Sequence, residues 1–278
     1  MKIKHLQLLI FFTFISLSAS AVKDSLLSKG KFYLGWGYNR DWYTKGNVHL
    51  VNNNPQLING TYYTYDFTIY DAKASDRAQF DRIYDVANIT IPQFSVRIGY
   101  YFNDKKDFGI ELNYDHAKYV VNDYQTVRIK GQINGQYMDK DTILDPQKLL
   151  HFEHTDGANF MMFTFIKRWK LLESKNKKNN LGIVLKPGFG FVYPRTDVTL
   201  FGNRINNDWK ISEIVGGLEA GFRAELIRNA YIEFTAKSGY ANYINALVQG
   251  KGYGKASNKF GFLETILIVG YQFQLKHK

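Results

Sequence analysis

The sequence predicts an all-β fold, an eight-stranded up-and-down antiparallel transmembrane β-barrel with long extracellular loops. Three observations lead to this prediction. Runs of about ten residues alternate apolar residues with polar or small ones, as the segment from Phe94 to Phe102 does. Aromatic residues make up 16% of the chain, which is high for a soluble domain and typical of the aromatic girdles at membrane interfaces. An export signal precedes all of these segments.

The chain begins with the pattern of a secretory signal peptide. Two lysines precede an uncharged apolar segment, residues 6–17, and the small residues of the Ala19-Ser-Ala21 motif follow it. This pattern predicts cleavage after Ala21, so we expect a signal peptide at residues 1–21 and a single barrel domain at residues 22–278. The apolar segment is too short for a membrane anchor, because spanning a bilayer with a helix needs ~20 residues.

Eight amphipathic segments are expected to be the membrane strands. Short connections alternate with long ones along the chain, as in barrels with short periplasmic turns and long extracellular loops. The expected strands are residues 31–44, 90–103, 108–121, 152–169, 180–193, 210–226, 230–244 and 259–275. Two further segments, 61–70 and 125–134, also alternate, which leaves a ten-stranded barrel as the alternative. Ten strands would place the short connection 103–107 outside the cell, so both segments are better explained as hairpin arms that extend beyond the bilayer.

The alternation also predicts which side chains point inward. In the first strand, Leu34 and Trp36 should face lipid and Tyr33 should face inward, whereas the fourth strand is apolar on both faces from Phe160 to Ile166. A set of charged residues falls on inward positions: Arg97, Glu111, Asp115, Lys186, Glu219, Arg223, Glu233, Lys237 and Glu264. The lumen of a barrel of this size is just wide enough for side chains to fill. Because an unpaired buried charge costs several kcal/mol, we expect a network of ion pairs there, with a gated ion path as the alternative.

The signal peptide, the amphipathic strands and the aromatic-rich final strand, Ile266 to Phe273, together resemble small bacterial outer-membrane barrels of the OmpX and OmpA transmembrane-domain type. The final strand is similar to the strand by which the barrel-assembly machinery recognises its clients, although the tail, Leu275 to Lys278, lacks the terminal aromatic residue of many clients. The resemblance implies an integral outer-membrane protein of a Gram-negative type envelope, in contact with outer-membrane lipid. The net charge of +11 then favours acidic headgroups or polyanionic envelope components as neighbours, and no nucleic acid partner is expected.

One histidine pair invites a catalytic or metal-binding hypothesis. His151 and His154 are three residues apart, which in a strand places them on opposite faces, so chelation would need a bulge. His154 and Asp156 share a face. An outer-membrane lipid A deacylase has His and Ser two apart on a barrel strand, but here Asp156 occupies the serine position and the hydroxyl of Thr155 lies on the other face. We therefore expect no catalytic residue, cofactor or metal, and keep a lipid-modifying hydrolase as the alternative.

The long loops are the expected site of function. The first loop, Lys45 to Ile89, has about 45 residues, far beyond the ~12–15 at which unstructured loops become uncommon. Aromatic types enriched in binding hot spots gather in and beside it: Trp42, Tyr43, Tyr62, Tyr63, Tyr65 and Tyr70. The leading hypothesis is a non-enzymatic barrel that binds through its loops, or an accessory subunit of an envelope complex. The partner would be another envelope protein or a surface glycan, and a narrow channel is a further alternative.

Overall fold

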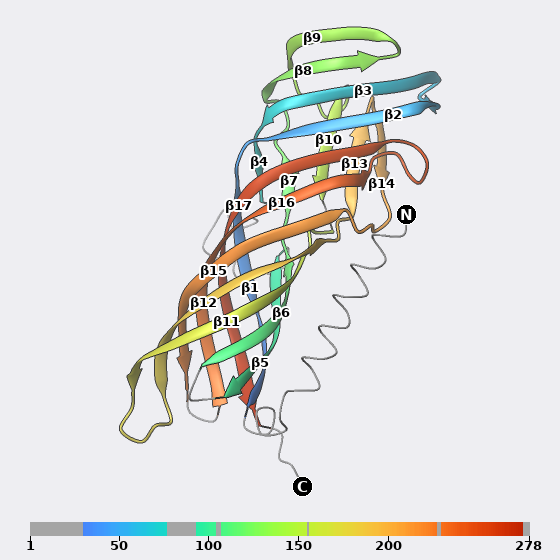
Figure 1. Ribbon diagram of the computed structural model, residues 1–278. Helices are drawn as coiled ribbons and strands as arrows, with labels where there is room; N and C mark the ends of the chain where they lie inside the picture. The colour runs from blue at the N-terminus through green and yellow to red at the C-terminus, as the bar shows by residue number, and fades with distance from the viewer. Residues whose placement is uncertain (1–29, 77–92, 104–106, 155, 227–228, 275–278) are drawn as a thin grey trace, which may run out of the picture.

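Eight strands of the computed structural model close into an antiparallel up-and-down ring. The structure describes residues 30–76, 93–103, 107–154, 156–226 and 229–274. The ring strands are β1 (Lys31–Tyr43), β5 (Phe94–Asn103), β6 (Phe108–His116), β11 (Phe160–Glu173), β12 (Asn180–Val192), β15 (Glu213–Glu225), β16 (Ala230–Leu247) and β17 (Lys255–Phe273). Each pairs with the next in this order, and β17 pairs back to β1 (Figure 1).

This ring confirms the eight-stranded barrel, and the ten-stranded alternative is wrong. The predicted signal peptide lies outside the described residues and stays a prediction. Among the residues that the structure does describe, no helix is long and apolar enough to cross a membrane.

The predicted facing of the strands agrees with the ring. Leu34 and Trp36 of β1 are each about half exposed on the outer surface, whereas Tyr33 is fully buried in the lumen. Small inward residues make room for large ones, since a Cβ atom on Gly99 would lie 2.1 Å from the Tyr33 ring. Large apolar side chains therefore cover the outer wall, as expected of a surface that faces lipid.

Among the described residues, nine further strands form a layer beyond the extracellular end of the ring, which we call the extracellular extension. They are β2 (Gly46–Ile58), β3 (Thr61–Ala72), β4 (Ala74–Ser75), β7 (Tyr119–Val121), β8 (Thr126–Ile133), β9 (Gln136–Ile143), β10 (Leu150–His154), β13 (Thr196–Leu200) and β14 (Asn203–Asn206). One series, β2-β3-β8-β9, continues from β17, and the other, β4-β7-β10-β13-β14, continues from β1. Figure 1 shows both above the ring. The segments predicted as hairpin arms, 61–70 and 125–134, lie in β3 and β8, which pair with each other.

Tight turns join three hairpins of the extension. At Asn59-Gly60, Asn134-Gly135 and Phe201-Gly202, both residues have positive φ angles. Two consecutive residues with positive φ are the requirement of the type I′ turn, whose twist matches that of two paired strands. Asn and Gly tolerate this conformation best, and they occupy all but one of these positions.

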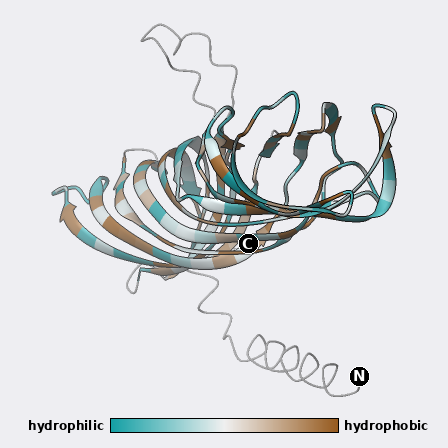
Figure 2. Ribbon diagram, turned by 90° about the horizontal axis from the view of Figure 1, so that it is seen from above, coloured by the Kyte–Doolittle hydropathy of each residue, from teal (hydrophilic) through white to brown (hydrophobic). Residues whose placement is uncertain are grey.

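An apolar core lies between the two series of the extension and reaches into the mouth of the ring. Its largest members are Tyr65, Phe67, Tyr119, Phe152, Phe160, Tyr243, Phe260 and Phe262. Phe160 and Met162 point inward from β11 into this core, which explains why that strand is apolar on both faces near its extracellular end. The described parts of the long connections are therefore folded together around one core, and Figure 2 shows their strands side by side.

Candidate functional site

The structure brings the nine predicted lumen charges together in the interior of the ring, and all of them are buried. Arg97 of β5 contacts three of the lumen acids. Its guanidinium is 2.6 Å from Asp115, 3.5 Å from Glu219 and 3.6 Å from Glu111. One cation thus links carboxylates from two other strands, β6 and β15.

The two lumen lysines connect the remaining acids. Lys186 Nζ lies 3.3 Å from Glu111 and 3.4 Å from Glu219, and it also contacts Glu233. Lys237 Nζ lies 3.1 Å from Glu264 and 3.6 Å from Glu219, and it also contacts Asp115. Arg223 pairs with Glu233 at 3.3 Å. Each lumen cation therefore has at least one carboxylate partner, as burial requires.

Further lumen residues were not anticipated from the sequence. Arg168 of β11 lies 2.6 Å from Asp107 and also contacts Glu225 near the periplasmic end. The alternation did not predict that Arg168 points inward, because the preceding part of its strand, from Phe160 to Ile166, is apolar on both faces. The Tyr33 hydroxyl donates to Glu111 at 2.6 Å, and the Arg223 guanidinium lies 3.6 Å from the centre of the Tyr231 ring. Aromatic rings thus complete the packing of the network.

His154 is a core residue of the extension. Its ring is fully buried, stacks on Tyr243 with centroids 4.5 Å apart, and has no hydrogen-bond partner on either nitrogen. Burial lowers the pKa of His154 to about 3, so the imidazole is neutral at physiological pH. Asp156 pairs with Arg195 instead, and Thr155 lies outside the described residues. His154 and Asp156 therefore do not form a hydrogen-bonded pair in this structure.

His151 lies on the other face of β10 and has acidic neighbours. Its Nδ1 is 2.8 Å from Asp123 and its Nε2 is 3.6 Å from Glu153. The interaction with Glu153, with the Asp123 carboxylate next, raises the pKa of His151 to about 9. A protonated His151 therefore ties β10 to the segment that follows β7.

The predicted binding aromatics divide into two groups. Tyr65 is buried in the apolar core, Tyr63 stacks on Phe201 with centroids 4.4 Å apart, and the Tyr43 hydroxyl donates to the Lys118 carbonyl. These three side chains hold the extension together, because their strands turn one face towards the core, and they are not available as a contact surface.

Trp42 and Tyr62 are exposed and Tyr70 is half-buried. Trp42 is an outward residue of the ring strand β1, a position that suits the membrane interface better than a partner. Only Tyr62 and Tyr70 therefore remain as candidate contact residues from the predicted set.

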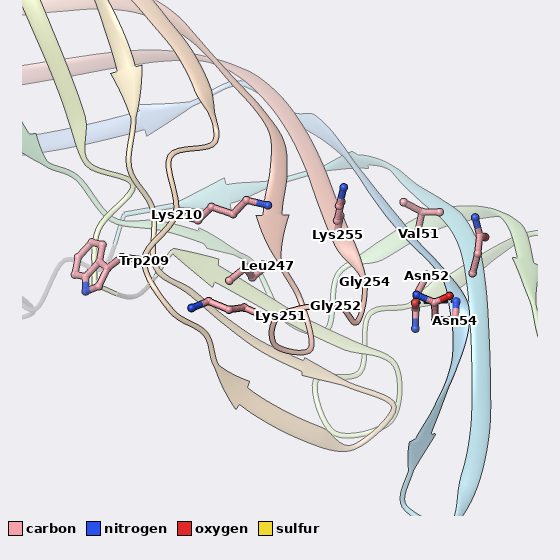
Figure 3. Close-up of a pocket in the computed structure, with 11 residues that line it drawn as sticks. Val51, Asn52, Asn54, Trp209, Lys210, Leu247, Lys251, Gly252, Gly254 and Lys255 are labelled. Carbon is pink, nitrogen blue, oxygen red and sulfur yellow. Dashed lines mark hydrogen bonds between the residues drawn. The ribbon is translucent and has the colours of Figure 1, made fainter.

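The extension contains a basic pocket of about 710 Å³, which we call the lysine pocket. Its lining comes from β2, from the segment that leads into β15, and from the ends of β16 and β17 with the turn between them (Figure 3). The residues are Val51, Asn52, Asn53, Asn54, Trp209, Lys210, Leu247, Lys251, Gly252, Gly254 and Lys255. Sequence reasoning missed this site because its members are up to about 200 positions apart in the chain. Pairing of β2 with β17 places Val51 opposite Lys255.

Comparisons with known proteins give only weak similarities, all of them to solved structures. No family model matches the sequence, and no curated protein matches it. Among solved structures, Neisserial surface protein A is 11% identical, with a TM-score of 0.35, over 87% of this chain and 97% of that one. OprG from Pseudomonas aeruginosa is 13% identical, with a TM-score of 0.36, over 90% and 99%. Ail of Yersinia pestis, solved with the heparin analogue sucrose octasulfate, is 11% identical, with a TM-score of 0.30, over 88% and 99%.

These sequence identities and TM-scores are too low to assign a role to this chain. The assignment of its architecture depends instead on the ring of strands and its apolar outer wall. A closed antiparallel ring with a lipid-facing exterior is the architecture of outer-membrane barrels. The chain is an integral outer-membrane protein of a Gram-negative type envelope.

Proposed function

We propose that this protein is a non-enzymatic outer-membrane binding protein that presents its ligand surface on the extracellular extension. The observation that supports the proposal is the apolar core of the extension, in which Phe67, Phe152 and Phe260 are buried. A surface whose segments are already held in place loses less conformational entropy on binding than free loops do. The extension is therefore suited to recognising a ligand outside the cell.

The lumen and His154 argue against the two alternative functions, a channel and a hydrolase. A channel needs a continuous path for ions, whereas the lumen of this ring is crossed by ion pairs such as Arg97–Asp115 and Lys237–Glu264. A hydrolase needs a base that can reach a nucleophile, whereas His154 is packed between aromatic rings without a polar partner. An accessory subunit of an envelope complex would use the same extension as its docking surface.

The test compares the full protein, reconstituted in phospholipid vesicles, with Phe152→Ala. Truncating this buried ring should destabilise the extension by about 3–5 kcal/mol. The matched control, Phe222→Ala, truncates a ring that faces lipid. We expect Phe152→Ala to lose binding to a printed array of saccharides and envelope proteins, and to gain protease sensitivity in the extension, while both variants keep a heat-modifiable barrel.

Two results would overturn the proposal. One is steady conductance of porin size in planar bilayers, which would mean that the lumen is an open path. The other is hydrolysis of outer-membrane lipid that His154→Ala removes, which would support the hydrolase alternative.

A further inference from the structure

We infer that the lysine pocket binds a saccharide that carries a phosphate or sulfate group. The inference rests on the proposed function, since it names the ligand class of the extension. A volume of about 710 Å³ lies in the range of ~300–1,000 Å³ that is usual for small-ligand sites. Three features of the lining identify the class: its charge, an unpaired hydrogen-bond donor and an aromatic platform.

The first feature is an excess of positive charge. The pocket is lined by Lys210, Lys251 and Lys255, and none of its lining residues is acidic. Within the part of the chain that the structure describes, neither Lys210 nor Lys255 has a carboxylate partner. Burial, followed by repulsion from Lys255, lowers the pKa of Lys210. A bound anion would relieve this repulsion.

The partner of the third lysine does not neutralise the pocket. Lys251 pairs with Asp208 at 3.2 Å, and both side chains are at least 70% exposed. Exposed ion pairs contribute little, so Lys251 can turn towards a ligand at small cost. The ion pair of Lys251 with Asp208 therefore does not remove the positive charge that Lys210 and Lys255 give to the pocket.

The second feature is a donor without a partner. Asn52 is 4% exposed and lines the pocket. Its Oδ1 accepts a hydrogen bond from the Asn54 backbone N–H at 3.1 Å, while its Nδ2 has no partner. A buried donor that is left unpaired costs about 1–3 kcal/mol, so a small rotation of the Asn52 side chain that brings Nδ2 to an acceptor oxygen of a ligand would recover this cost. Phosphate, sulfate and sugar hydroxyl oxygens are such acceptors.

The third feature is an aromatic platform. Trp209 is 40% exposed, and one face of its indole stacks on Tyr193 with centroids 5.3 Å apart. In Figure 3, Trp209 lies at one end of the lining and Asn52 at the other, with the lysines between them. The electron-rich face of an indole attracts the C–H groups of a sugar ring. This order fits a saccharide whose ring packs on Trp209 while its anionic group reaches the lysines.

The experiment measures binding to the full protein in nanodiscs of uncharged phosphatidylcholine. The probes are fluorescent maltotetraose, the same sugar carrying sulfate esters, and inorganic phosphate. We expect the sulfated sugar to bind, with affinity that falls as salt is raised, and the neutral sugar to bind at least tenfold more weakly. The double variant Lys210→Gln/Lys255→Gln should weaken binding of the sulfated sugar at least tenfold. Trp209→Leu should weaken the sulfated sugar but leave inorganic phosphate unchanged.

A matched control separates the pocket from net charge. Lys140→Gln/Lys148→Gln removes the same charge from exposed lysines of the extension outside the pocket and should bind as the wild type does. Equal affinity in the two double variants, or equal affinity for the neutral sugar, would overturn the inference. If the pocket variant binds normally but Phe152→Ala does not, the pocket is wrong and the proposed function stands. If Phe152→Ala also binds normally, both are wrong.

A further experiment identifies the molecule that carries the anionic group. Phosphatidylcholine vesicles are doped with the outer-leaflet glycolipid of the same cells, either native or stripped of its phosphates. Phosphate-dependent capture that is lost in Lys210→Gln/Lys255→Gln supports the pocket with a lipid-borne ligand. Phosphate-independent capture, together with pocket-dependent binding of the sulfated sugar, supports the pocket with a soluble glycan.

Discussion

Replacing Arg97 with methionine should strongly destabilise the barrel. The side chain is fully buried, with carboxylates at 2.6, 3.5 and 3.6 Å from its guanidinium nitrogens. The predicted network has four cations and five acids, so Arg97→Met leaves the acids in clear excess. Breaking a buried pair by removing one partner costs about 3–5 kcal/mol, because the partner's charge stays behind. Methionine preserves most of the volume, so the loss reports on charge and not on a cavity.

The assay is urea unfolding in phosphatidylcholine vesicles, followed by tryptophan fluorescence. Arg128→Met is the matched control, because Arg128 Nε lies 2.7 Å from Asp139 but both side chains are solvated. We expect the control to unfold near the wild-type midpoint, since exposed pairs contribute little. Adding Asp115→Asn to Arg97→Met should recover part of the loss. If Arg97→Met unfolds at the same urea concentration as the control, the lumen charges are hydrated and the reasoning is refuted.

Three further predictions concern other parts of the chain. His154→Phe should keep or raise stability, because it removes two unpaired buried nitrogens. In the wild type, His154 lowers the free energy of unfolding by up to about 1.4 kcal/mol per pH unit as the pH falls below the unfolded pKa of ~6.5, and the variant should lose less stability on acidification. Urea titrations of both proteins at matched pH values check both expectations. The pKa of His151 is raised to about 9, so the stability that its ion pairs contribute is complete below pH ~6.5 and is lost as the pH rises through 9. Because the ring is partly solvated, we expect this contribution to be only about 1 kcal/mol. Proteolysis of the extension at pH 6 and pH 10 checks it, with His151→Gln as the pH-insensitive control. N-terminal sequencing of the mature protein should begin at Val22, and a retained apolar segment would contradict the export signal.

The ring could be predicted from sequence because a membrane barrel imposes a strict rule on every strand. Outward residues face lipid and inward residues face the lumen, so the alternation appears in β1, β6 and β17 without knowledge of their neighbours. The same parity placed Glu111 and Glu264 inside the ring. Which acid pairs with which base could not be predicted, because the register between strands sets those distances. Arg168 was missed because the apolar core reaches the inward face of β11.

The extension was harder to predict because its strands do not cross the membrane. Its two longest hairpins did carry a local signal, since Asn59-Gly60 and Asn134-Gly135 are the dipeptides most typical of type I′ turns. The core behind them gave no such signal, because its residues come from strands that are far apart in the sequence, such as β3, β10 and β17. Tyr65 was therefore interpreted as a contact residue although it is a core residue.

The lysine pocket shows why the extension must be treated as one unit. Asn52 belongs to β2, whose partner β3 contributes Tyr65 and Phe67 to the core. Removing the long first loop would therefore take away core side chains together with pocket residues, and the loss of binding would say nothing about recognition. Substitutions at Lys210 and Lys255 leave every buried apolar contact in place. Comparing them with Phe152→Ala separates the chemistry of the site from the stability of the layer that carries it.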